Sequence, residues 1–182
     1  ILARMTPIAD RHPRFISGTK QWHGEIQSAI ETVARLSGAE LIDFHEPLYP
    51  YPNLLPDAIH PNPEGAGILA KTVYSGITGN YGGLQMSQLY TDYMVLQRNV
   101  PLDIHGTANA GEKITVSIGN QTATATADNQ GKWCAVLQPM EATDDLTLTV
   151  KAGRQTNVYR HVAVGEVWLC SGQSNMAFML CQ

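Results

Sequence analysis

Charge, cysteine and long apolar runs are all scarce in this sequence. Charged residues make up 15% of the 182 residues, the formal net charge is −4 and no basic block occurs, which argues against nucleic acid as a partner. No apolar run approaches the roughly 18 residues of a membrane-spanning helix. The three cysteines, Cys134, Cys170 and Cys181, are too few and odd in number for a disulfide framework, and we expect small buried side chains. No histidine pair has metal-ligand spacing.

The sequence does have enough apolar residues for a sizeable core. They make up 43% of a chain whose length suits one domain or two small ones. Residues 1–8 lack the shape of a signal peptide, because their apolar run is too short and no cleavage site follows. We interpret them as a core strand already under way, and expect the chain to begin inside a larger protein.

Strand and helix patterns alternate over the first eighty residues. Residues 19–37 predict a helix, and a short strand is expected at residues 39–45. A second helix should begin at Pro63, with Asn62 as its cap, and end at Gly79. This order implies a parallel sheet with crossover helices, of which the region supplies half a domain. The apolar stripes expected on the two helices are Trp22, Ile26, Ile30, Val33 and Leu36, and Ala66, Leu69, Ala70, Val73 and Ile77.

From about Gly83 the apolar residues alternate with polar ones. The alternation over residues 113–118, 133–137 and 146–150, with turns roughly every ten residues, predicts an antiparallel β-sandwich. Hairpin turns are expected at Gly119-Asn120 and at Asn129-Gln130-Gly131. The three tryptophans, Trp22, Trp133 and Trp168, are expected in the core rather than stacked on sugar rings.

Residues 162–170 form an almost wholly apolar run. Such a run suits a strand that is buried on both faces, as in a parallel sheet. It leads into a Gly-Ser turn and a further apolar stretch at residues 177–180, which is the pattern of a strand-to-helix elbow. The sequence therefore predicts that a new α/β domain begins here.

The run Asp57-Ala58-Ile59-His60 is a candidate for acid–base chemistry. An imidazole exchanges protons near neutral pH, and it works best when a carboxylate holds one of its ring nitrogens. Two positions three apart on a tight turn bring Asp57 within reach of His60. The alternative is a loop in which Asp57 caps a turn and His60 is a surface residue. The pair His45-Glu46, which follows the expected strand, does not make a metal site by itself.

Ser174, in the run Gly172-Gln173-Ser174-Asn175-Met176, is the candidate nucleophile. A serine at a strand end and a helix N-terminus has an exposed hydroxyl and backbone N–H groups that can stabilise an oxyanion. Met176 stands where the nucleophile elbow of the α/β-hydrolases has its second glycine, so that motif is not present. The alternative is that Ser174 only caps a helix.

Both motifs resemble those of the SGNH (GDSL-type) hydrolases. The run from Pro56 to Asn62, followed by Glu64-Gly65, is similar to the C-terminal Asp-x-x-His block of that superfamily. The stretch from Met94-Val95-Leu96-Gln97-Arg98 through Val164–Met176 resembles the N-terminal part of the sialate O-acetylesterase family. There a β-rich domain precedes a catalytic domain whose nucleophile lies in the Gly-Gln-Ser-Asn-Met motif. The resemblance implies Ser174 as nucleophile, His60 as base and Asp57 as the residue that orients it.

The order of the motifs departs from the family's pattern. In these hydrolases the serine comes first, whereas here His60 precedes Ser174 and the family's Gly and Asn oxyanion-hole blocks do not lie between them. The simplest account is a junction in a tandem esterase, with the end of an SGNH (flavodoxin-like) α/β domain at residues 1–80. A β-sandwich at 84–161 and the first strand and nucleophile turn of a second SGNH-type domain at 162–182 would follow. A rearranged single domain that uses Asp57, His60 and Ser174 together is the alternative.

The expected function is therefore carboxylester hydrolysis. The resemblance implies removal of O-acetyl groups from carbohydrate, with sialic acid as the family's substrate, through an acyl-enzyme and without a metal or organic cofactor. It also implies an extracytoplasmic location, and we expect the rest of the parent polypeptide to be needed. The competing hypotheses are an inert carbohydrate-binding or spacer β-sandwich, and an esterase for other acetylated glycans or lipids.

Overall fold

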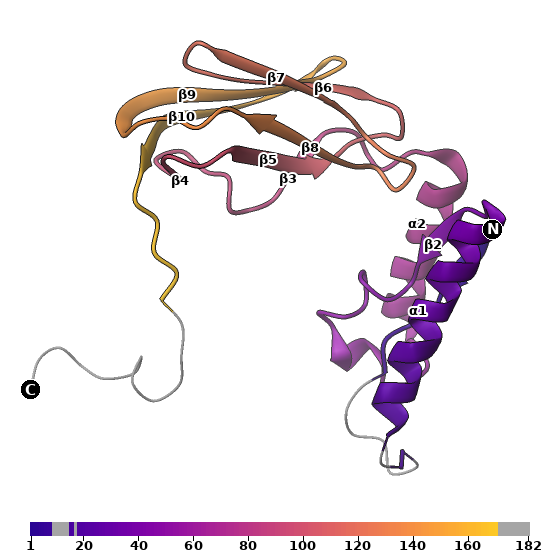
Figure 1. The fold of residues 1–182 in the computed structure, drawn as a ribbon. Coiled ribbons are helices and arrows are strands. Elements are labelled where there is room, and N and C mark those ends of the chain that lie inside the picture. Colours follow the sequence, from indigo (N-terminus) through magenta and orange to yellow (C-terminus); the bar gives the residue numbers. More distant parts are fainter. Residues whose placement is uncertain (9–14, 17, 171–182) are drawn as a thin grey trace, which may run out of the picture. The chain divides into compact units, whose positions relative to one another are not determined.

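A computed structural model describes residues 1–8, 15–16 and 18–170. The chain divides into two compact units, which we describe separately (Figure 1). The first comprises Ile1–Tyr81 with the short segment Asn129–Gly131, and the second comprises Gly82–Asp128 and the described residues from Lys132 onward. The first unit is mixed α/β and contains both helices of the described residues, whereas the second is built from strands.

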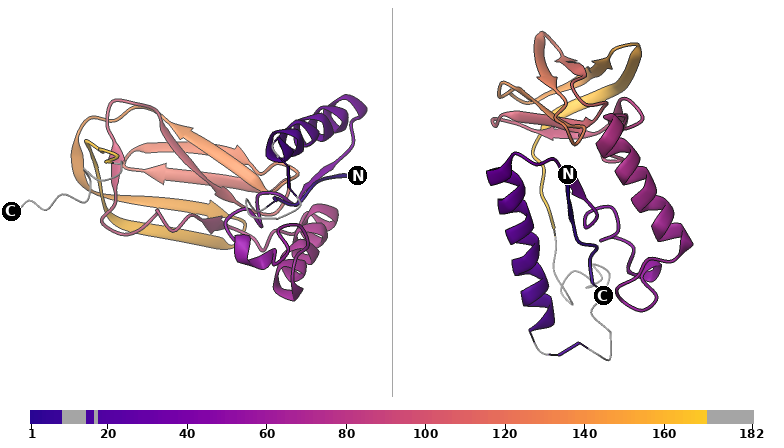
Figure 2. Two further views of the ribbon diagram at one scale, coloured as in Figure 1. Left: turned by 90° about the horizontal axis from the view of Figure 1, so that it is seen from below. Right: turned by 90° about the vertical axis from the view of Figure 1, so that its right-hand side faces the viewer.

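The first unit is a strand–helix–strand arrangement followed by a second helix. Its elements are β1 (Leu2–Arg4), α1 (Thr19–Ser37), β2 (Leu41–Asp43), the single turn η1 (Pro52–Leu54) and α2 (Pro63–Thr78). β1 and β2 pair in parallel, as the alternation of strand and helix predicts. α1 contacts β1 and α2 contacts β2, and the two helices flank the strand pair (Figure 2).

The ends of both helices are where the capping residues predict them. Gly38 takes a left-handed conformation with φ 66° after α1, and Gly79 does so with φ 68° after α2. At the start of α2, the Asn62 side chain accepts a hydrogen bond from the Gly65 N–H at 2.9 Å, and Pro63 occupies the first helical position. These predictions are confirmed, because capping depends on the residues next to the helix end and not on what the helix packs against.

The predicted apolar stripes, in contrast, are not the buried faces of the helices. Trp22, Val33 and Leu36 are exposed on α1, where the buried side chains are His23, Gln27 and Ala34. The reason is that polar side chains of α1 form hydrogen bonds with the backbone of the residues just after β1. The Gln27 side-chain amide donates to the Met5 carbonyl at 2.7 Å, and its oxygen accepts from the Met5 N–H at 2.9 Å. On α2, Ile77 is exposed, and the helix approaches β2 through Gly76, which lies against Ile42.

The second unit consists of two sheets. The larger has the order β4 (Val95–Gln97), β10 (Gln155–Gly165), β9 (Thr143–Ala152), β6 (Lys113–Ile118) and β7 (Gln121–Thr126), and only β4 and β10 run parallel. The smaller has the order β3 (Gln85–Met86), β5 (Leu102–Thr107) and β8 (Lys132–Leu137), all antiparallel. In Figure 1 the two sheets form separate layers.

One apolar core lies between these two sheets. Alternate residues of β6, Ile114, Val116 and Ile118, are buried together with side chains from β5, β8, β9 and β10. Each such side chain stabilises the fold by about 1.5–3 kcal/mol relative to an exposed one. Trp133 belongs to this core, as predicted, and is 3% exposed. Cys134, its neighbour on β8, is exposed with a free thiol, so the expectation of a buried side chain is wrong for it. The alternation of β8 places it on the outer face.

One expected turn and the last strand differ from their predictions. Asn129-Gln130-Gly131 is not a hairpin turn, because β7 and β8 belong to different sheets. The strand expected to begin at residue 162 instead runs from Gln155 to Gly165, as β10 of the larger sheet. Residues 166–170 follow it without strand pairing. Cys170 and Trp168 are exposed there, so both expectations of burial are wrong, as is that for Trp22. Cys181 lies outside the described residues.

Candidate active site

The loop between β2 and α2 is held at both ends by hydrogen bonds from its backbone N–H groups. At its start, Asp43 Oδ1 accepts from the N–H groups of His45 at 2.8 Å and Glu46 at 3.2 Å. At its end, the Asn62 N–H donates to the Leu54 carbonyl at 2.8 Å. Leu54 is 3% exposed, within a small apolar cluster that also includes Leu48 and Leu55. The ends of the segment from Leu55 to Asn62 are therefore held together by a hydrogen bond, and the segment begins at a buried leucine cluster.

Asp57 and His60 contact each other at the tip of this turn. His60 Nδ1 lies 2.6 Å from Asp57 Oδ2. The other carboxylate oxygen, Oδ1, accepts from the backbone N–H groups of Ile59 at 3.0 Å and His60 at 2.7 Å. Ala58 takes a left-handed conformation with φ 66°, and its N–H donates to the Leu55 carbonyl. The predicted reach of Asp57 to His60 is thus confirmed as a contact.

This geometry defines what the imidazole of His60 can do. Because an ionised carboxylate only accepts hydrogen bonds, the contact requires the proton on Nδ1 and leaves Nε2 with a lone pair. The hydrogen bond from the His60 side chain, followed by those from the His60 and Ile59 backbone, holds the pKa of Asp57 well below its usual range. An ionised carboxylate on Nδ1 also stabilises the imidazolium that forms when Nε2 takes a proton.

The pair lies at the surface of the first unit. The His60 side chain is 78% exposed and that of Asp57 is 49% exposed. Among the described residues, Asp57 is the only hydrogen-bond partner of the His60 ring. Ser174, together with its neighbours from Gly172 to Met176, lies outside the described residues. Its assignment as nucleophile therefore stays a prediction, as do the catalytic roles of Asp57 and His60.

The two halves of the longer motif, at residues 94–98 and 164–176, are linked at the end of β10. Arg98 donates to Glu166 at 2.6 Å, and the Val167 N–H donates to the Gln97 side chain at 2.8 Å. The hydrogen bond from Arg98 lowers the pKa of Glu166. The Arg98 N–H also donates to the Gly165 carbonyl at 2.9 Å. These contacts fix the point at which the chain leaves the larger sheet, a few residues before the Ser174 motif.

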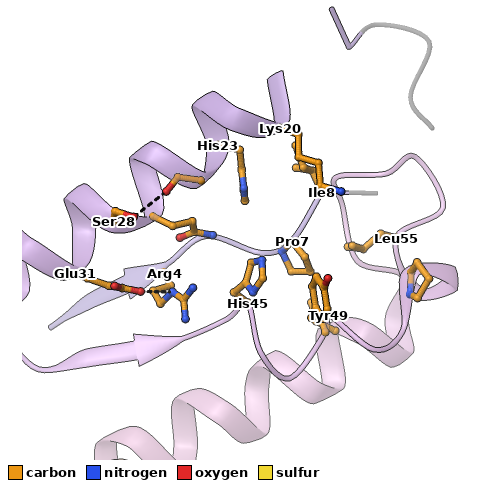
Figure 3. A pocket seen from close by; sticks show the side chains of 14 residues that line it. Arg4, Pro7, Ile8, Lys20, His23, Ser28, Glu31, His45, Tyr49 and Leu55 are labelled. Carbon is orange, nitrogen blue, oxygen red and sulfur yellow. Dashed lines mark hydrogen bonds and ion pairs between the residues drawn. The ribbon is translucent and has the colours of Figure 1, made fainter. Parts of the chain in front are cut away.

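A cavity of about 540 Å³ lies within the first unit, beyond the carboxyl ends of β1 and β2 (Figure 3). That edge of a parallel sheet is where ligands bind in α/β proteins. Figure 3 shows side chains from three places around it: the segment after β1, one face of α1 and the loop after β2. The lining side chains include Arg4, Pro7, Lys20, His23, Gln27, Glu31, His45, Leu48, Tyr49 and Leu55.

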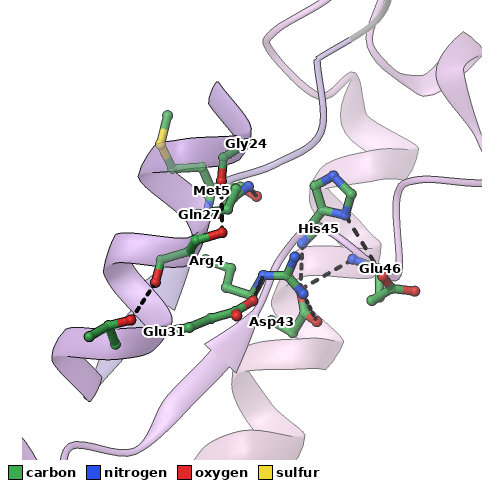
Figure 4. Close-up of polar contacts among 10 residues, drawn as sticks. Arg4, Met5, Gly24, Gln27, Glu31, Asp43, His45 and Glu46 are labelled. Atoms are coloured by element: carbon green, nitrogen blue, oxygen red, sulfur yellow. Dashed lines mark hydrogen bonds and ion pairs between the residues drawn. The ribbon is translucent and has the colours of Figure 1, made fainter. Parts of the chain in front are cut away.

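The charges beside this cavity compensate one another. The Arg4 guanidinium binds Asp43 through Nη1 at 3.0 Å and forms an ion pair with Glu31 through Nε at 3.1 Å (Figure 4). Burial, and secondly the Arg4 charge, lower the pKa of His45, which favours its neutral imidazole. His23 hydrogen-bonds through Nε2 to the Thr6 carbonyl at 3.0 Å, which requires a proton on that nitrogen.

Sequence reasoning did not find this cavity. His45 was considered only for metal binding, and no group of three or more His, Cys, Asp and Glu side chains in the described part of the chain could hold a metal ion. The signal that could have found it is polar spacing. His23 and Gln27 are four residues apart, so they lie on one face of α1, the helix that follows β1. His45 comes two residues after the end of β2.

This chain of an α/β unit and a β-rich unit is similar to several known proteins. No family model matches the chain. The chain is similar to the sialate O-acetylesterase of Rattus norvegicus, with 28% identity over 133 residues, covering 66% of this chain and 24% of that protein. It is similar to the sialate O-acetylesterase of Mus musculus with 29% identity over 111 residues, covering 55% of this chain and 20% of that protein.

A solved structure is similar as well. It is a carbohydrate acetylesterase from Xanthomonas citri, with 35% sequence identity and a TM-score of 0.49, and the match covers 50% of this chain and 21% of that one. The chain spans about a quarter or less of the length of the curated relatives it matches. The curated relatives are both named sialate O-acetylesterase. Neither helix of the described residues is long and apolar enough to cross a membrane.

Proposed function

We propose that this chain carries parts of a serine esterase of the SGNH type, which removes O-acetyl groups from carbohydrate, with sialic acids as the first substrates to test. The observation that carries the proposal is the contact of 2.6 Å between His60 Nδ1 and Asp57 Oδ2. The relatives named as acetylesterases support the reaction class. An extracytoplasmic location and a need for the rest of the parent polypeptide are part of this proposal.

The proposed reaction proceeds in two halves. His60 Nε2 takes the proton of a serine hydroxyl while the serine oxygen attacks the acetyl carbonyl carbon, and Asp57 stabilises the imidazolium. The imidazolium then returns the proton to the departing sugar oxygen, which leaves an acetyl-serine. The same imidazole then takes a proton from water as its oxygen attacks the acetyl-serine, and returns that proton to the departing serine oxygen, so that acetate is released and the serine is restored. Neither a metal nor an organic cofactor takes part in these steps.

We further propose that His60 and Ser174 serve different active sites. His60 follows the second strand of an α/β unit, whereas Ser174 follows the β-rich unit by a few residues. The exposed apolar side chains of Val167, Trp168 and Leu169 suit a strand that is covered by a further α/β domain. Under this arrangement residues 1–80 end one esterase domain, and the segment after β10 begins another.

The test is p-nitrophenyl acetate hydrolysis by the full-length protein and its variants. We expect His60→Ala to remove the activity of the first site and Ser174→Ala that of the second, each by at least about a thousandfold in kcat for its own site. Fluorophosphonate labelling should mark Ser174 in the wild type and not in Ser174→Ala. If both variants hydrolyse the ester at the wild-type rate, or if Ser174 is not labelled, the assignment is wrong.

A matched control for His60 exists in the second unit. His161 Nδ1 lies 2.7 Å from Asp145 Oδ1, so this exposed pair has the same kind of contact outside the candidate site. His161→Ala should leave ester hydrolysis at the wild-type rate. An equal loss in His161→Ala and His60→Ala would show that removal of any surface imidazole lowers activity, which would contradict the specific role of His60.

One observation favours a second candidate function, carbohydrate binding by the β-rich unit without catalysis. Tyr93 is 73% exposed and stacks on His161, with ring centroids 4.8 Å apart and an interplanar angle of 17°. Tyr93, Asp145 and His161 all have positive φ values, which is uncommon for such side chains. Glycan binding that is lost in Tyr93→Ala, in a chain without esterase activity, would favour this function.

A further inference from the structure

We infer that Ala58 is a positioning residue of the candidate site, and that its left-handed backbone conformation holds Asp57 against His60. The inference deepens the proposed function and rests on it, since it assigns the group that aligns the proposed base. Three properties of Ala58 support it: its conformation, its burial and its place at the junction of two successive turns.

The backbone of Ala58 is in a conformation that alanine rarely adopts. Its φ is 66°, where the Cβ atom of an L-residue crowds the backbone, and glycine alone adopts this conformation without steric cost. A strained conformation of this kind persists only where the surrounding structure enforces it, and such residues concentrate at functional sites. Ala58 directly follows Asp57 and lies two residues before His60.

A hydrogen bond and burial hold Ala58 in this conformation. Its N–H donates to the Leu55 carbonyl at 2.8 Å, which closes a turn with Pro56 at its second position. Ala58 is 5% exposed and Leu55 is 3% exposed, so both ends of this turn are buried. Because proline fixes its own φ, the turn has little freedom to adjust. The strain at Ala58 is therefore carried by a buried and hydrogen-bonded turn.

A second turn begins where the first one ends. Asp57 Oδ1 accepts from the N–H groups of Ile59 at 3.0 Å and His60 at 2.7 Å, so a side-chain oxygen takes the place of a backbone carbonyl. Both N–H groups reach this oxygen because the left-handed conformation of Ala58 folds the chain back toward Asp57. The His60 ring then lies beside the other carboxylate oxygen, with Nδ1 2.6 Å from Oδ2. A negative φ at Ala58 would point the following backbone in another direction, and the ring contact would be lost.

The experiment compares two side chains of similar size at position 58. Ala58→Thr introduces a β-branched residue, which rarely adopts a positive φ, and Ala58→Asn introduces one that adopts it more readily. Nitrogen-15 NMR of the histidine rings in the 182-residue chain reports which nitrogen of His60 carries the proton. Carbon-13 NMR of the side chain follows the titration of Asp57. Neither measurement needs esterase activity.

We expect Ala58→Thr to remove the preference of the His60 proton for Nδ1, because the carboxylate that accepts it is displaced. The pKa of Asp57 should rise toward its usual value, since the hydrogen bonds that lower it are lost. In the full-length protein, kcat for ester hydrolysis should fall at least about a hundredfold with little change in KM. Ala58→Asn should keep both NMR signatures. Wild-type signals in Ala58→Thr, or equal changes in both variants, would overturn the inference.

A second variant covers the case that Ala58→Thr does not fold. Pro56→Gly frees the φ of an exposed residue in the turn that holds Ala58, and it removes no hydrogen-bond donor. It should shift the His60 and Asp57 signals in the same direction by a smaller amount, and unchanged signals would overturn the inference. Ala34→Thr is the control, because it enlarges another buried alanine of the first unit, within α1. It should leave both signals unchanged, and changes equal to those of Ala58→Thr would overturn the inference as well.

The outcome is separable from that of the proposed function. Signals of His60 and Asp57 that depend on Ala58, in a protein without esterase activity, would support the positioning role and reject the proposed function. Ester hydrolysis that depends on His60, with signals that do not respond to Ala58, would overturn the inference and leave the proposed function in place.

Discussion

Asp57 is held as a carboxylate by contacts that lie within four consecutive residues. Its two oxygens accept three hydrogen bonds, one from the His60 ring and two from the backbone of Ile59 and His60. All three come from the same tight turn, so they form whenever the turn forms, and they do not need a buried environment. The orientation of the His60 imidazole is therefore a property of the loop itself.

The first prediction concerns the titration of this carboxyl group. Because hydrogen bonds favour the ionised form, the pKa of Asp57 should lie well below its usual value of about 3.9 in carbon-13 NMR of the side chain. A lowered folded-state pKa means that its contribution to stability is complete above about pH 4 and is lost as the pH falls through the folded-state pKa.

His60→Ala provides the control for this titration. It removes the largest cause of the shift and leaves two backbone hydrogen bonds. The pKa of Asp57 should therefore move back toward its usual value, but not reach it. An unchanged titration midpoint in His60→Ala would show that the contact between Asp57 and His60 does not persist in solution.

For individual residues, the sequence predicted contacts between positions close together in the chain well, and contacts between distant positions poorly. The contact between Asp57 and His60 spans three residues and follows from the turn. The contacts of Gln27 with Met5 and of His23 with Thr6 span 22 and 17 residues and depend on how α1 lies against β1. Apolar periodicity gives no information on such polar contacts, so it placed the buried face of α1 on the wrong residues.

At the scale of the element, α2 shows how glycines set the approach of a helix. A Cβ atom at Gly65 would lie 3.0 Å from Pro61 Cβ and 3.3 Å from the Leu54 carbonyl oxygen, whereas nothing lies within 4 Å of one at Gly67. Gly65 is thus buried against the loop that carries Asp57 and His60, and Gly67, two residues later, faces open space. The same substitution has opposite consequences at the two positions.

The second prediction compares these two glycines. Gly67→Ala should raise the free energy of unfolding of the first unit by about 0.8–1.0 kcal/mol, the difference in helix propensity. Gly65→Ala should lower it by about 1–3 kcal/mol, because the added methyl group overlaps the loop. Urea unfolding followed by the helical circular dichroism signal measures both. Stabilisation by both alanines would mean that α2 does not pack on this loop.

For the strands, prediction succeeded where one face of the strand is buried. It failed where a strand includes polar residues that break the alternation of apolar and polar side chains. The alternation in β6 and β8 identified the inward side chains, since burial of one face imposes a period of two. The start of β10 was missed because residues 155–161 are mostly polar, and their pairing with β9 comes from backbone hydrogen bonds and not from side-chain burial.

At the scale of the whole molecule, the two units differ in how much core they contain. The second unit has one large cluster of buried side chains drawn from both of its sheets. Among its described residues, the first unit has a small apolar cluster, Leu48, Leu54 and Leu55 with two partly buried neighbours, and a two-stranded sheet. A two-stranded sheet with little apolar cover is only marginally stable, so the first unit should unfold more easily than the second.

The last prediction follows from this difference and is tested by hydrogen exchange in the intact chain. The backbone N–H groups of β6 and β9 lie in the middle of the five-stranded sheet over the large core, so they should exchange most slowly, through unfolding of the second unit. Those of β1, β2 and α1 should exchange faster, through openings that cost less free energy. The control is Val116→Ala, which should lower the protection of β6 and β9, because it leaves a cavity in the core that costs about 2–4 kcal/mol, and should leave α1 unchanged. Equal protection of α1 and β9, falling together in Val116→Ala, would show instead that the two units unfold as one.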